Sequence, residues 1–535
     1  MEVTSMPRHP APLAAAARVG EIVTVLWAGG FRWLVDALGL RACVSPRCRA
    51  LCTLGLRPCE HHAVMDRPLP ERTRHVLEEL GPTFVKAGQM LALRPDYVPA
   101  AYAEALQGLY ADVPPFPAAD AARVVTEELG RPPREAFAGF EPEPFAAASL
   151  SQVHRARLPD GTQVAVKVQR PGVDAQVEED LVLLRWLARR LERRSAVARR
   201  FRPADAVEEV AEWTRRELDF RREASTAQTL RSYFADDDSV VIPRVHERWT
   251  TRRVLTMDLL HGRRPAPAAE LRQAGLDPQR VLETGARAVL RQVFEFGLFH
   301  ADPHPGNLLV LPGERVAFLD FGMFGRVDPR QRHRMGLMLW ALVDGDYDTA
   351  VGQLLRLSER RPEADVPGFR RAVADLVEDW YGRSAREYSV ARLLLAQLGA
   401  GAAHGIVFPR ELMLLARTLL TLESTGALID PDITLADLTR TVLPDLKRIL
   451  LPTLPTVSAL THTLADTNRA RLVLALELDV PEALQRLNDF LTAATAPPAP
   501  SPQRARPPVL ALLIAGAAGA VLARLGRRRR GRPLP

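Results

Sequence analysis

Apolar residues recur at two different spacings along this chain, and the spacing changes several times. Residues 71–110 carry them at the three- and four-residue intervals of a helix. A strand-rich block is predicted from about 141 to 172. Residues 173–235 return to long charged helices, and Val254–Leu260 indicates a buried strand. The middle of the chain therefore predicts a small β-rich lobe.

A mainly helical lobe is expected after it. A helix precedes Gly297, and two short strands follow, Asn307–Leu311 and Arg315–Leu319. From Pro329 to about Leu491 the pattern is helical. The Ala- and Pro-rich residues 493–508 are typical of a linker. Together these patterns predict an α+β fold.

The length of 535 residues is too great for one compact core, so we expect several domains. We assign seven segments: 1–70 an N-terminal extension with a cysteine-rich stretch, 71–130 a helical unit, 131–262 the β-rich lobe, 263–450 the helical lobe, 451–505 a helical extension and linker, 506–526 a candidate membrane-anchor helix, and 527–535 a basic tail.

The composition is that of a folded globular protein, with 47% hydrophobic and 25% charged residues. A net charge of +7 allows anionic partners such as nucleotides or acidic lipid, but selects none of them. Aromatic and basic residues do not alternate as they do on nucleic-acid platforms, so we expect no nucleic-acid partner. Whether the chain forms a homodimer stays open.

Both ends of the chain bear on localisation. We expect no signal peptide, because Glu2 is acidic and the apolar run Ala11–Ala17 is short. Val509–Ala523 is an apolar run of 15 residues, about 22 Å long as a helix against a hydrocarbon core of roughly 30 Å. The basic run Arg527–Arg530 favours a membrane anchor with a cytoplasmic C-terminus. A buried helix or a tail for oligomer packing is the alternative.

The four cysteines fall between residues 43 and 59, as Cys43, Cys48, Cys52 and Cys59. A disulfide framework would normally be spread through a secreted chain. Their spacing also lacks the C-x2-C pair that is usual at zinc sites. We interpret them as reduced, unconnected thiols, with a metal or redox site as the alternative.

Lysine is rare in this chain. Three of its 71 basic residues are lysines, Lys86, Lys167 and Lys447, so the other 68 are arginines. A lysine kept against this bias is expected to do what a guanidinium cannot, as a compact charge with an adjustable pKa. Lys167 lies in the run VAVKV, where Val164, Val166 and Val168 should face a core. Ala165 and Lys167 should face the other way, as a surface for a base and for phosphates.

The strongest chemical signal is the loop HADPHPGN, residues 300–307. Asp302 and Asn307 have the D-x4-N spacing of a kinase catalytic loop, and Asp320 opens a DFG sequence thirteen residues later. Asp302 is a candidate base or orienter of the attacking group, and Asp320 is a candidate Mg²⁺ ligand. Asn307 either holds a second metal ion or orients Asp302. His300 and His304 could form a metal pair only on a helix, which the prolines forbid. We expect these histidines to hold the loop by hydrogen bonds.

Two neighbouring segments complete the candidate site. A positioned lysine needs a carboxylate partner, and Asp219 and Glu223 share one face of a predicted helix. Before the lysine strand, where kinases carry a glycine-rich loop, this chain has the alanine-rich residues 145–149. Such a loop offers backbone N–H groups but is stiffer, so it should accept nucleotide in a narrower range of geometries.

Together these motifs resemble the UbiB/AarF (ADCK) family of atypical kinases over about residues 71–350. The shared sequences, in family order, are the KxGQ motif Lys86–Gln89, AAAS, VAVKVQRPG, ELDFRREA, VLTMDLLHG, HADPHPGN and DFG. The cysteine-rich stretch is a departure from the family. So is the single C-terminal apolar segment, where many bacterial members carry two.

The resemblance implies a protein-kinase-like two-lobe fold with a helical KxGQ cover over the site. It implies catalytic roles for Lys86, Gln89, Lys167, Glu217, Asp219, Glu223 and Asp302; cofactor contacts by Ala146, Ala147, Ala148, Ser149, Ala165, Lys167 and Met257; and metal binding by Asn307 and Asp320. In the family, Glu223 pairs with Lys167, and the KxGQ lysine contacts the acids of the ExD motif, here Glu217 and Asp219.

The implied function is Mg²⁺- and ATP-dependent kinase or ATPase activity that supports ubiquinone or other isoprenoid-quinone lipid metabolism. The implied partners are a nucleotide and a membrane lipid or quinone precursor, at the cytoplasmic face of a membrane. Two alternatives stay open at this point: a protein or small-molecule kinase with an unknown acceptor, and a nucleotide-gated lipid-binding scaffold with little turnover.

Overall fold

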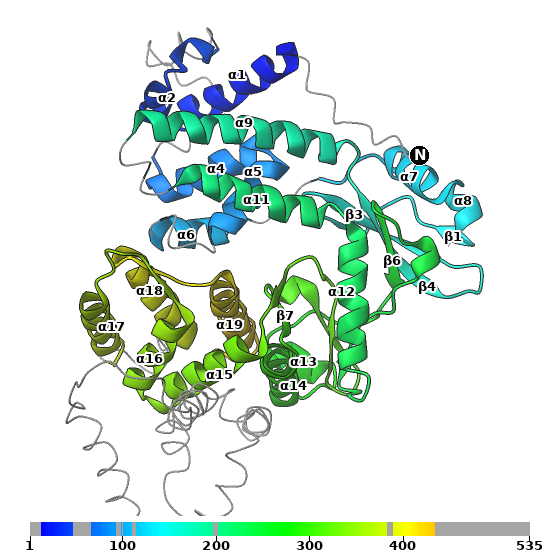
Figure 1. Cartoon of the computed structure of the whole chain (residues 1–535). Coiled ribbons are helices and arrows are strands. Elements are labelled where there is room, and N and C mark those ends of the chain that lie inside the picture. Colours follow the sequence, from blue (N-terminus) through cyan, green and yellow to red (C-terminus); the bar gives the residue numbers. More distant parts are fainter. Residues whose placement is uncertain are drawn as a thin grey trace, which may run out of the picture. The chain divides into compact units, whose positions relative to one another are not determined.

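The computed structural model describes residues 12–45, 66–92, 98, 100–109, 114–195, 199, 202–381 and 389–433 (Figure 1). The chain divides into two compact units, and every described residue belongs to the first, Met1–Thr463. The predictions made for Cys48, Cys52, Cys59, the C-terminal apolar run and the basic tail lie outside the described residues.

Helices dominate the N-terminal part. They are α1 (Pro12–Ala28), α2 (Arg32–Leu38), the short η1 (Arg41–Cys43), α4 (Leu69–Leu80), α5 (Pro82–Leu91) and α6 (Ala100–Gln107). Figure 1 shows them stacked around two longer helices, α9 (Val173–Arg194) and α11 (Pro203–Glu217). Gly81 separates α4 from α5 with a φ of 97°, which favours glycine, and Pro82 begins α5.

The β-rich lobe contains a five-stranded antiparallel sheet. Its strands are β1 (Gly139–Phe140), β2 (Ala146–Ala147), β3 (Ser151–Arg157), β4 (Gln163–Gln169) and β6 (Val254–Asp258), in the order β1-β3-β4-β6 with β2 paired to β3. Val164, Val166 and Val168 are fully buried against α7 (Ala118–Leu129) and its neighbour α8 (Pro133–Ala136). The predicted alternation of β4 is confirmed, and so is the buried strand β6.

Helix α12 (Phe220–Tyr233) lies against this sheet (Figure 1). It begins at Asp219, whose side chain accepts a hydrogen bond from the backbone N–H of Arg221 and so caps the helix. After α12 the chain forms the short strand β5 (Val240–Val241) and the turn η3 (Glu247–Trp249) before it returns to the sheet as β6.

The second lobe begins with helices and then places the predicted loop on short strands. Its first elements are α13 (Ala268–Gln273), α14 (Pro278–Arg291), the π-helical turn η4 (Gln292–Phe296), β7 (Leu298–His300), η5 (Pro305–Asn307), β8 (Leu308–Leu311), β9 (Arg315–Phe318) and β10 (Phe324–Arg326). Strands β8 and β9 form the predicted antiparallel hairpin, which brings Asn307 and Leu319 into hydrogen-bond contact.

Helices complete the second lobe. They are α15 (Pro329–Asp344), α16 (Tyr347–Leu357), α17 (Val366–Tyr381), α18 (Val390–Ala403) and α19 (Arg410–Ile429). The all-helical prediction from Pro329 onward needs one correction, because β11 (Glu359–Arg360) pairs with β12 (Ile406–Val407). Two residues per strand are too few to leave a period-two pattern in the sequence.

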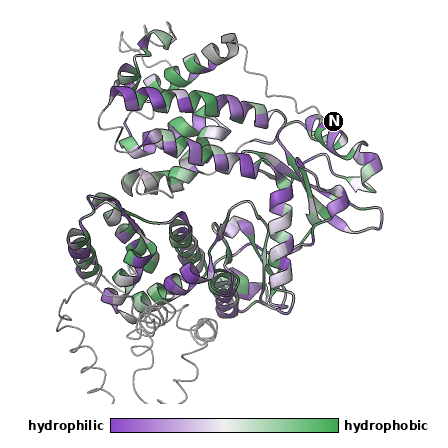
Figure 2. Ribbon diagram, in the orientation of Figure 1, coloured by the Kyte–Doolittle hydropathy of each residue, from purple (hydrophilic) through white to green (hydrophobic). Residues whose placement is uncertain are grey.

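The pattern of buried residues follows the alternation of hydropathy along the elements. Figure 2 shows hydrophilic and hydrophobic positions interleaved along α9, as expected of a helix with one buried face. Within the described part of the chain, α19 is long and apolar enough to cross a membrane, but 61% of its apolar window is buried inside the protein. That burial is typical of a core helix, so α19 carries no argument for a membrane span.

Candidate active site

Lys167 and Glu223 form the central ion pair of the site. The Lys167 Nζ donates to both carboxylate oxygens of Glu223, at 2.9 Å each. The alternation of β4 turns Lys167 away from the valine core, and Glu223 lies in the first turn of α12. The Lys167 side chain is 17% exposed and that of Glu223 only 6%, so neither charge is well solvated. Of the two acids that the sequence offered, Glu223 is therefore the one that pairs with Lys167.

Asp320 lies on the other side of the same ammonium. Its Oδ1 is 3.9 Å from the Lys167 Nζ and accepts a hydrogen bond from the backbone N–H of Gly322 at 2.8 Å. Burial would raise the pKa of the Asp320 carboxyl, but Lys167 and the Gly322 N–H outweigh it and lower that pKa to about 2. Because 43% of the Asp320 side chain is exposed to solvent, the effect of burial on its pKa is weaker than the combined effect of the charged neighbours. Asp320 is consequently ionised at neutral pH.

The protonation of the Lys167–Glu223 pair follows from the same balance. Burial opposes the charged form of Lys167, but the carboxylates of Asp320 and Glu223 outweigh burial and raise the pKa of the ammonium. Burial raises the pKa of the Glu223 carboxyl against the attraction of Lys167. Lys167 is therefore a fixed positive charge, and Glu223 depends on it to remain ionised.

The catalytic-loop histidines hold the loop, as predicted. His300 Nδ1 accepts a hydrogen bond from the backbone N–H of Asp302, and His304 Nδ1 accepts one from that of Gly306, each at 3.0 Å. The side chain of Asn307 donates through Nδ2 to the backbone carbonyl of Asp302 at 3.2 Å. Burial lowers the pKa of the His300 imidazole to about 4, so this ring is neutral at pH 7.

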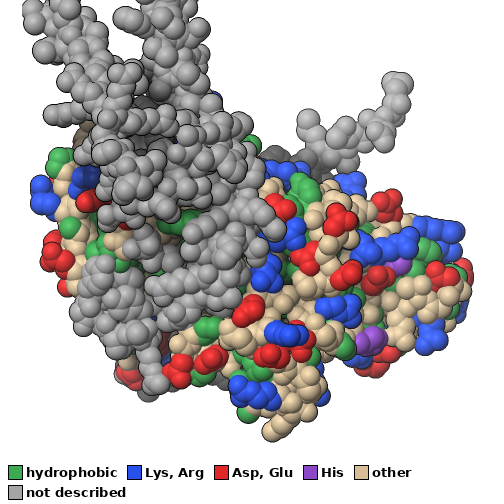
Figure 3. All heavy atoms as spheres, turned by 90° about the horizontal axis from the view of Figure 1, so that it is seen from below, with side chains coloured by type: hydrophobic (Ala, Val, Ile, Leu, Met, Phe, Trp, Pro, Cys, Tyr) green, Lys and Arg blue, Asp and Glu red, His purple; other side chains and the backbone are tan. Residues whose placement is uncertain are grey.

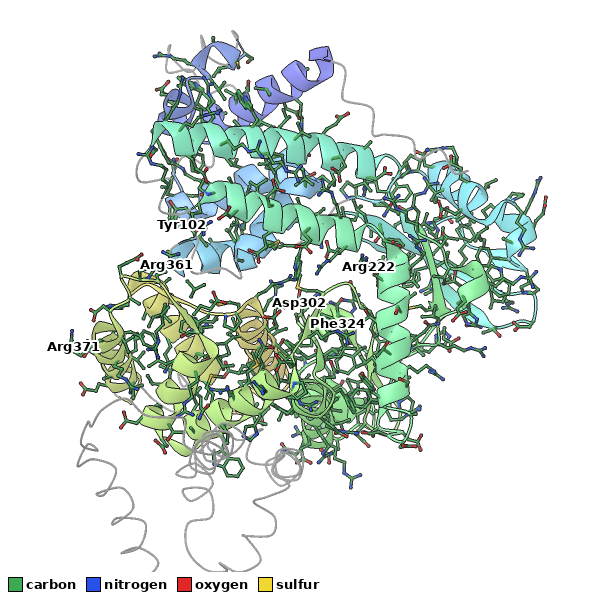
Figure 4. The ribbon with its side chains drawn as sticks, viewed as in Figure 1. Tyr102, Arg222, Asp302, Phe324, Arg361 and Arg371 are labelled. Atoms are coloured by element: carbon green, nitrogen blue, oxygen red, sulfur yellow. The ribbon has the colours of Figure 1, made fainter. Side chains whose placement is uncertain are left out.

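Helix α19 contributes a side chain that sequence reasoning missed. Arg417 donates through Nη2 to the Asp302 Oδ2 at 2.7 Å. The next residue, Thr418, donates to the backbone carbonyl of His300 at 3.1 Å. Figure 4 labels Asp302 on this second lobe, together with Phe324, whose ring packs against His300. Polar residues inside an otherwise apolar helix were the available signal, because such side chains need partners when they are buried.

The KxGQ helix meets the site through a second lysine–glutamate pair. The Lys86 Nζ donates to the Glu217 Oε1 at 2.9 Å, from α5 to the last turn of α11. Gly88 packs closely, since a Cβ there would lie 2.3 Å from the Leu109 Cδ1. Gln89 donates to the backbone carbonyl of Leu109 at 2.8 Å, so this hydrogen bond stays within the helical cover.

Asp219 differs from what the resemblance implies. Its carboxylate caps α12 and pairs with Arg221 at 2.7 Å, and within the described residues it forms no hydrogen bond with Lys86. The Lys86 contact is made by Glu217 instead. The Glu217–Lys86 pair is close to the DFG segment, because a Cβ at Gly322 would lie 4.0 Å from the Glu217 Oε1.

The alanine-rich segment is tied into the sheet. Ala146 and Ala147 form β2 and pair with β3, and the backbone N–H of Ala148 donates to the Ser151 carbonyl at 2.7 Å. That N–H is therefore already used, while Ser149 is buried. Across the sheet, Ala165 on β4 lies directly opposite Met257 on β6.

The residues present suit a magnesium–nucleotide complex. Mg²⁺ prefers oxygen ligands and is commonly held by one or two protein groups together with phosphates and water. Asp320 supplies an ionised carboxylate, and the side-chain oxygen of Asn307 accepts no hydrogen bond from the described residues. In the described ranges no cluster of three or more His, Cys, Asp or Glu could hold a metal ion by itself. Mg²⁺ bound here would take further oxygen ligands from phosphate or water.

Comparisons with known proteins identify the family of this chain. The model of the ABC1 atypical kinase-like domain matches residues 108–354, and that of the UbiB helical domain matches residues 373–434. A probable protein kinase UbiB from Marinobacter nauticus is 35% identical over 71% of this chain and 70% of its own length. The uncharacterized protein sll1770 of Synechocystis is 36% identical over 67% of this chain, which spans 62% of that relative.

A solved structure is also similar in sequence. Rv3197 of Mycobacterium tuberculosis, in complex with erythromycin, is 28% identical, with a TM-score of 0.46, over 68% of this chain and 93% of that one. The elements of the structure and the match to the ABC1 domain show an α+β, kinase-like fold, and its last described helices match the UbiB helical domain. This chain belongs to the UbiB family of atypical kinase-like proteins, which the ABC1 domain defines.

Proposed function

We propose that this protein binds Mg-ATP and transfers or releases its terminal phosphoryl group, in support of ubiquinone or other isoprenoid-quinone lipid metabolism at a membrane. In this proposal Lys167 contacts the α- and β-phosphates, and Glu223 holds Lys167 in place. Asp320 and Asn307 hold Mg²⁺, which would neutralise the charge on the phosphates when bound. Asp302 orients the attacking hydroxyl or water.

The observation that carries the proposal is the convergence of three motifs on one ammonium group. Lys167 is bonded to both oxygens of Glu223 at 2.9 Å and faces Asp320 at 3.9 Å. These residues come from β4, α12 and the segment after β9. An ion pair that served only the stability of the fold would need only Glu223 as the partner of Lys167. A second, ionised carboxylate that is 43% exposed suits a site prepared for a cation and phosphates.

Arg417 supports an orienting role for Asp302. One carboxylate oxygen, Oδ2, is held by the guanidinium at 2.7 Å. Among the described residues no hydrogen bond reaches the other oxygen, Oδ1, which can therefore accept one from an attacking hydroxyl or water. The side chain is held in one direction before a substrate arrives, which reduces the entropy cost of orienting the nucleophile.

The helical cover favours a small acceptor or water over a protein acceptor. The Lys86–Glu217 pair joins α5 to α11 next to Gly322 of the DFG segment. The charge of Lys86 also contributes to lowering the pKa of the Asp320 carboxyl. The KxGQ helix is thus electrostatically part of the site, and we expect it to limit what can approach the phosphates.

Membrane attachment is part of the proposal and rests on the sequence. The apolar run Val509–Ala523 and the basic run Arg527–Arg530 suit an anchor at the cytoplasmic face. The described face seen in Figure 3 carries interspersed acidic and basic side chains. A membrane lipid or quinone precursor is the proposed partner of the active site, and a homodimer is compatible with it.

Phosphate release by the purified full-length protein tests this function. Mg-ATP is supplied with and without anionic liposomes, and Asp320→Asn serves as the blank. Release above the blank that liposomes stimulate would support a membrane-coupled ATPase and make lipid precursors the next acceptors to test. Binding of Mg-ATP without release under either condition would favour the nucleotide-gated scaffold.

A further inference from the structure

A second concave site lies on the β-rich lobe. It is a groove of about 670 Å³ between the last turns of α12 and the segment from Arg244 to Trp249. The residues that line it include none of the candidate site residues. The nucleotide proposal therefore leaves this groove without a role.

The groove is basic. Arg231, Arg244 and Arg248 line it, against the single acidic residue Glu247. Within the described part of the chain, none of these three arginines forms an ion pair with a carboxylate. Arg231 donates through Nη1 to the Ile242 carbonyl at 2.6 Å, which fixes the side chain and leaves its other N–H groups available.

The other polar side chains that line the groove already have hydrogen-bond partners. The Glu247 Oε1 accepts a hydrogen bond from the Gln228 Nε2 at 2.6 Å. The His246 Nε2 is 2.8 Å from the Oδ1 of Asp258, which lies behind it on β6. Three guanidinium groups against one carboxylate leave a net positive charge, and these groups face solvent across the groove.

One wall of the groove is apolar. Val245 is buried, and Trp249 is partly buried with its Nε1 bonded to the Ala136 carbonyl at 3.0 Å. The Arg248 guanidinium lies 5.4 Å from the Trp249 ring centroid. A fixed aromatic face beside several guanidinium groups is suited to a ligand with a phosphate at one end and a ring or chain at the other.

We propose that this groove binds a small organic phosphate. Its phosphate would be held by Arg231, Arg244 and Arg248, because the planar guanidinium fork matches phosphate oxygens better than other cationic groups do. Its apolar part would lie against Val245 and Trp249. A free phosphorylated metabolite and the headgroup of a phospholipid share this chemistry.

The groove also has a physical connection to the active site. Gln228 and Arg231 lie on α12, the helix that presents Glu223 to Lys167. A ligand that steadies α12 would change nucleotide affinity, and nucleotide would change the affinity of the ligand by the same factor. This coupling rests on the proposed nucleotide function, whereas ligand binding to the groove does not.

Phenyl phosphate is a suitable probe, titrated into the full-length protein without nucleotide or Mg²⁺ and followed by calorimetry. The variant Arg244→Gln/Arg248→Gln removes two guanidiniums, and Arg134→Gln/Arg272→Gln is a control that removes two exposed arginines elsewhere. Each lost charge-assisted hydrogen bond should weaken binding roughly tenfold, so we expect about a hundredfold loss in the groove variant. The control should bind within about twofold of wild type, since it keeps every groove contact.

Three further comparisons make the test decisive. Inorganic phosphate should bind more weakly than phenyl phosphate if Trp249 contributes to binding. Short-chain phosphatidic acid, titrated in place of phenyl phosphate, distinguishes a lipid headgroup from a free metabolite. Asp320→Asn should bind the probe normally, while the groove variant should still bind Mg-ATP. The proposal is overturned if wild type does not bind the probe at millimolar concentration, if the groove variant binds as wild type does, or if Asp320→Asn abolishes probe binding.

Discussion

The two lysine–glutamate pairs of this protein have the same contact distance in different surroundings. Lys167–Glu223 and Lys86–Glu217 each have a closest approach of 2.9 Å. Lys167 bonds to both oxygens of its partner, which is 6% exposed, whereas Lys86 bonds to one oxygen of a partner that is 13% exposed. A second carboxylate, Asp320, adds to the charge around Lys167.

The comparison shows that distance does not define the role of an ion pair. The Lys167 pair is shielded from solvent and lies between the sheet and α12, so its charges depend on one another. The Lys86 pair joins α5 of the cover to α11 through a single hydrogen bond, so fewer contacts are lost when it is broken. We therefore assign the Lys167 pair to holding the phosphate-binding charge and the Lys86 pair to holding the cover in place.

Removal of each lysine should give the largest difference between the two pairs in the free energy of unfolding. Lys167→Met leaves Glu223 buried without its cation, and we expect a loss of about 3–5 kcal/mol in the free energy of unfolding. Lys86→Met should cost less, about 1–2 kcal/mol, because Glu217 loses one hydrogen bond and not two. Urea unfolding of both variants measures this difference. The double variant Lys167→Met/Glu223→Leu should recover part of the loss, and equal losses in the two single variants would contradict the comparison.

The pH dependence of stability should report on the buried catalytic loop. Burial lowers the pKa of His300 from 6.5 to about 4, so between these values the unfolded chain binds the proton and the folded chain does not. Stability is therefore fully present above about pH 6.5 and falls as the pH drops to about 4, by roughly 3 kcal/mol from this one group.

His300→Asn removes that titration and keeps an acceptor near the Asp302 N–H. The difference in unfolding free energy between variant and wild type should change with pH across this window, and Lys86→Met should show no such change. A constant difference from pH 7 to pH 4 would show that His300 does not resist protonation.

Substitution of Arg417 tests whether α19 positions Asp302. Loss of one charge-assisted hydrogen bond, worth about 1.5–3 kcal/mol, should lower the rate of phosphate release roughly 10- to 100-fold in Arg417→Gln. The affinity for Mg-ATP should change little, since the Lys167 pair does not involve Arg417. Arg417→Lys should recover part of the rate. A loss of nucleotide affinity as large as the loss of rate would mean that Arg417 acts on the fold and not on Asp302.

Gly88→Ala should give the smallest effect, confined to the cover. The added Cβ would lie 2.3 Å from the Leu109 Cδ1 and 2.7 Å from the Leu77 Cδ1, so both leucines must shift. We expect a cost of about 1–2 kcal/mol in unfolding free energy from this overpacking. Nucleotide affinity should remain close to that of wild type if the cover only limits access. A strong loss of nucleotide affinity would place the cover inside the binding site itself.

Local patterns predicted the parts of the site that are set by short segments. The period-two run of β4 placed Lys167 opposite the valine core, and the β8–β9 hairpin followed from its two apolar runs. Helix spacing offered Asp219 and Glu223 as partners of Lys167, the family resemblance implied Glu223, and the structure contains the Lys167–Glu223 contact.

Contacts that depend on tertiary packing could not be predicted in this way. Arg417 is 115 residues from Asp302 in sequence, and no periodicity links the two. Asp219 matches its motif but serves as a helix cap, because its position before α12 favours that local bond. The groove beside Trp249 exists only when α12 and η3 are brought together.

The central claim is that Lys167, and not Lys86, holds the charge that binds Mg-ATP. Calorimetric titration of ATP into wild type, Lys167→Met, Lys86→Met and Asp320→Asn, each with and without Mg²⁺, tests it directly. We predict magnesium-dependent binding by wild type and Lys86→Met, and a loss of tenfold or more in Lys167→Met and Asp320→Asn. Equal affinity in the two lysine variants, or binding that does not depend on magnesium, would contradict this account.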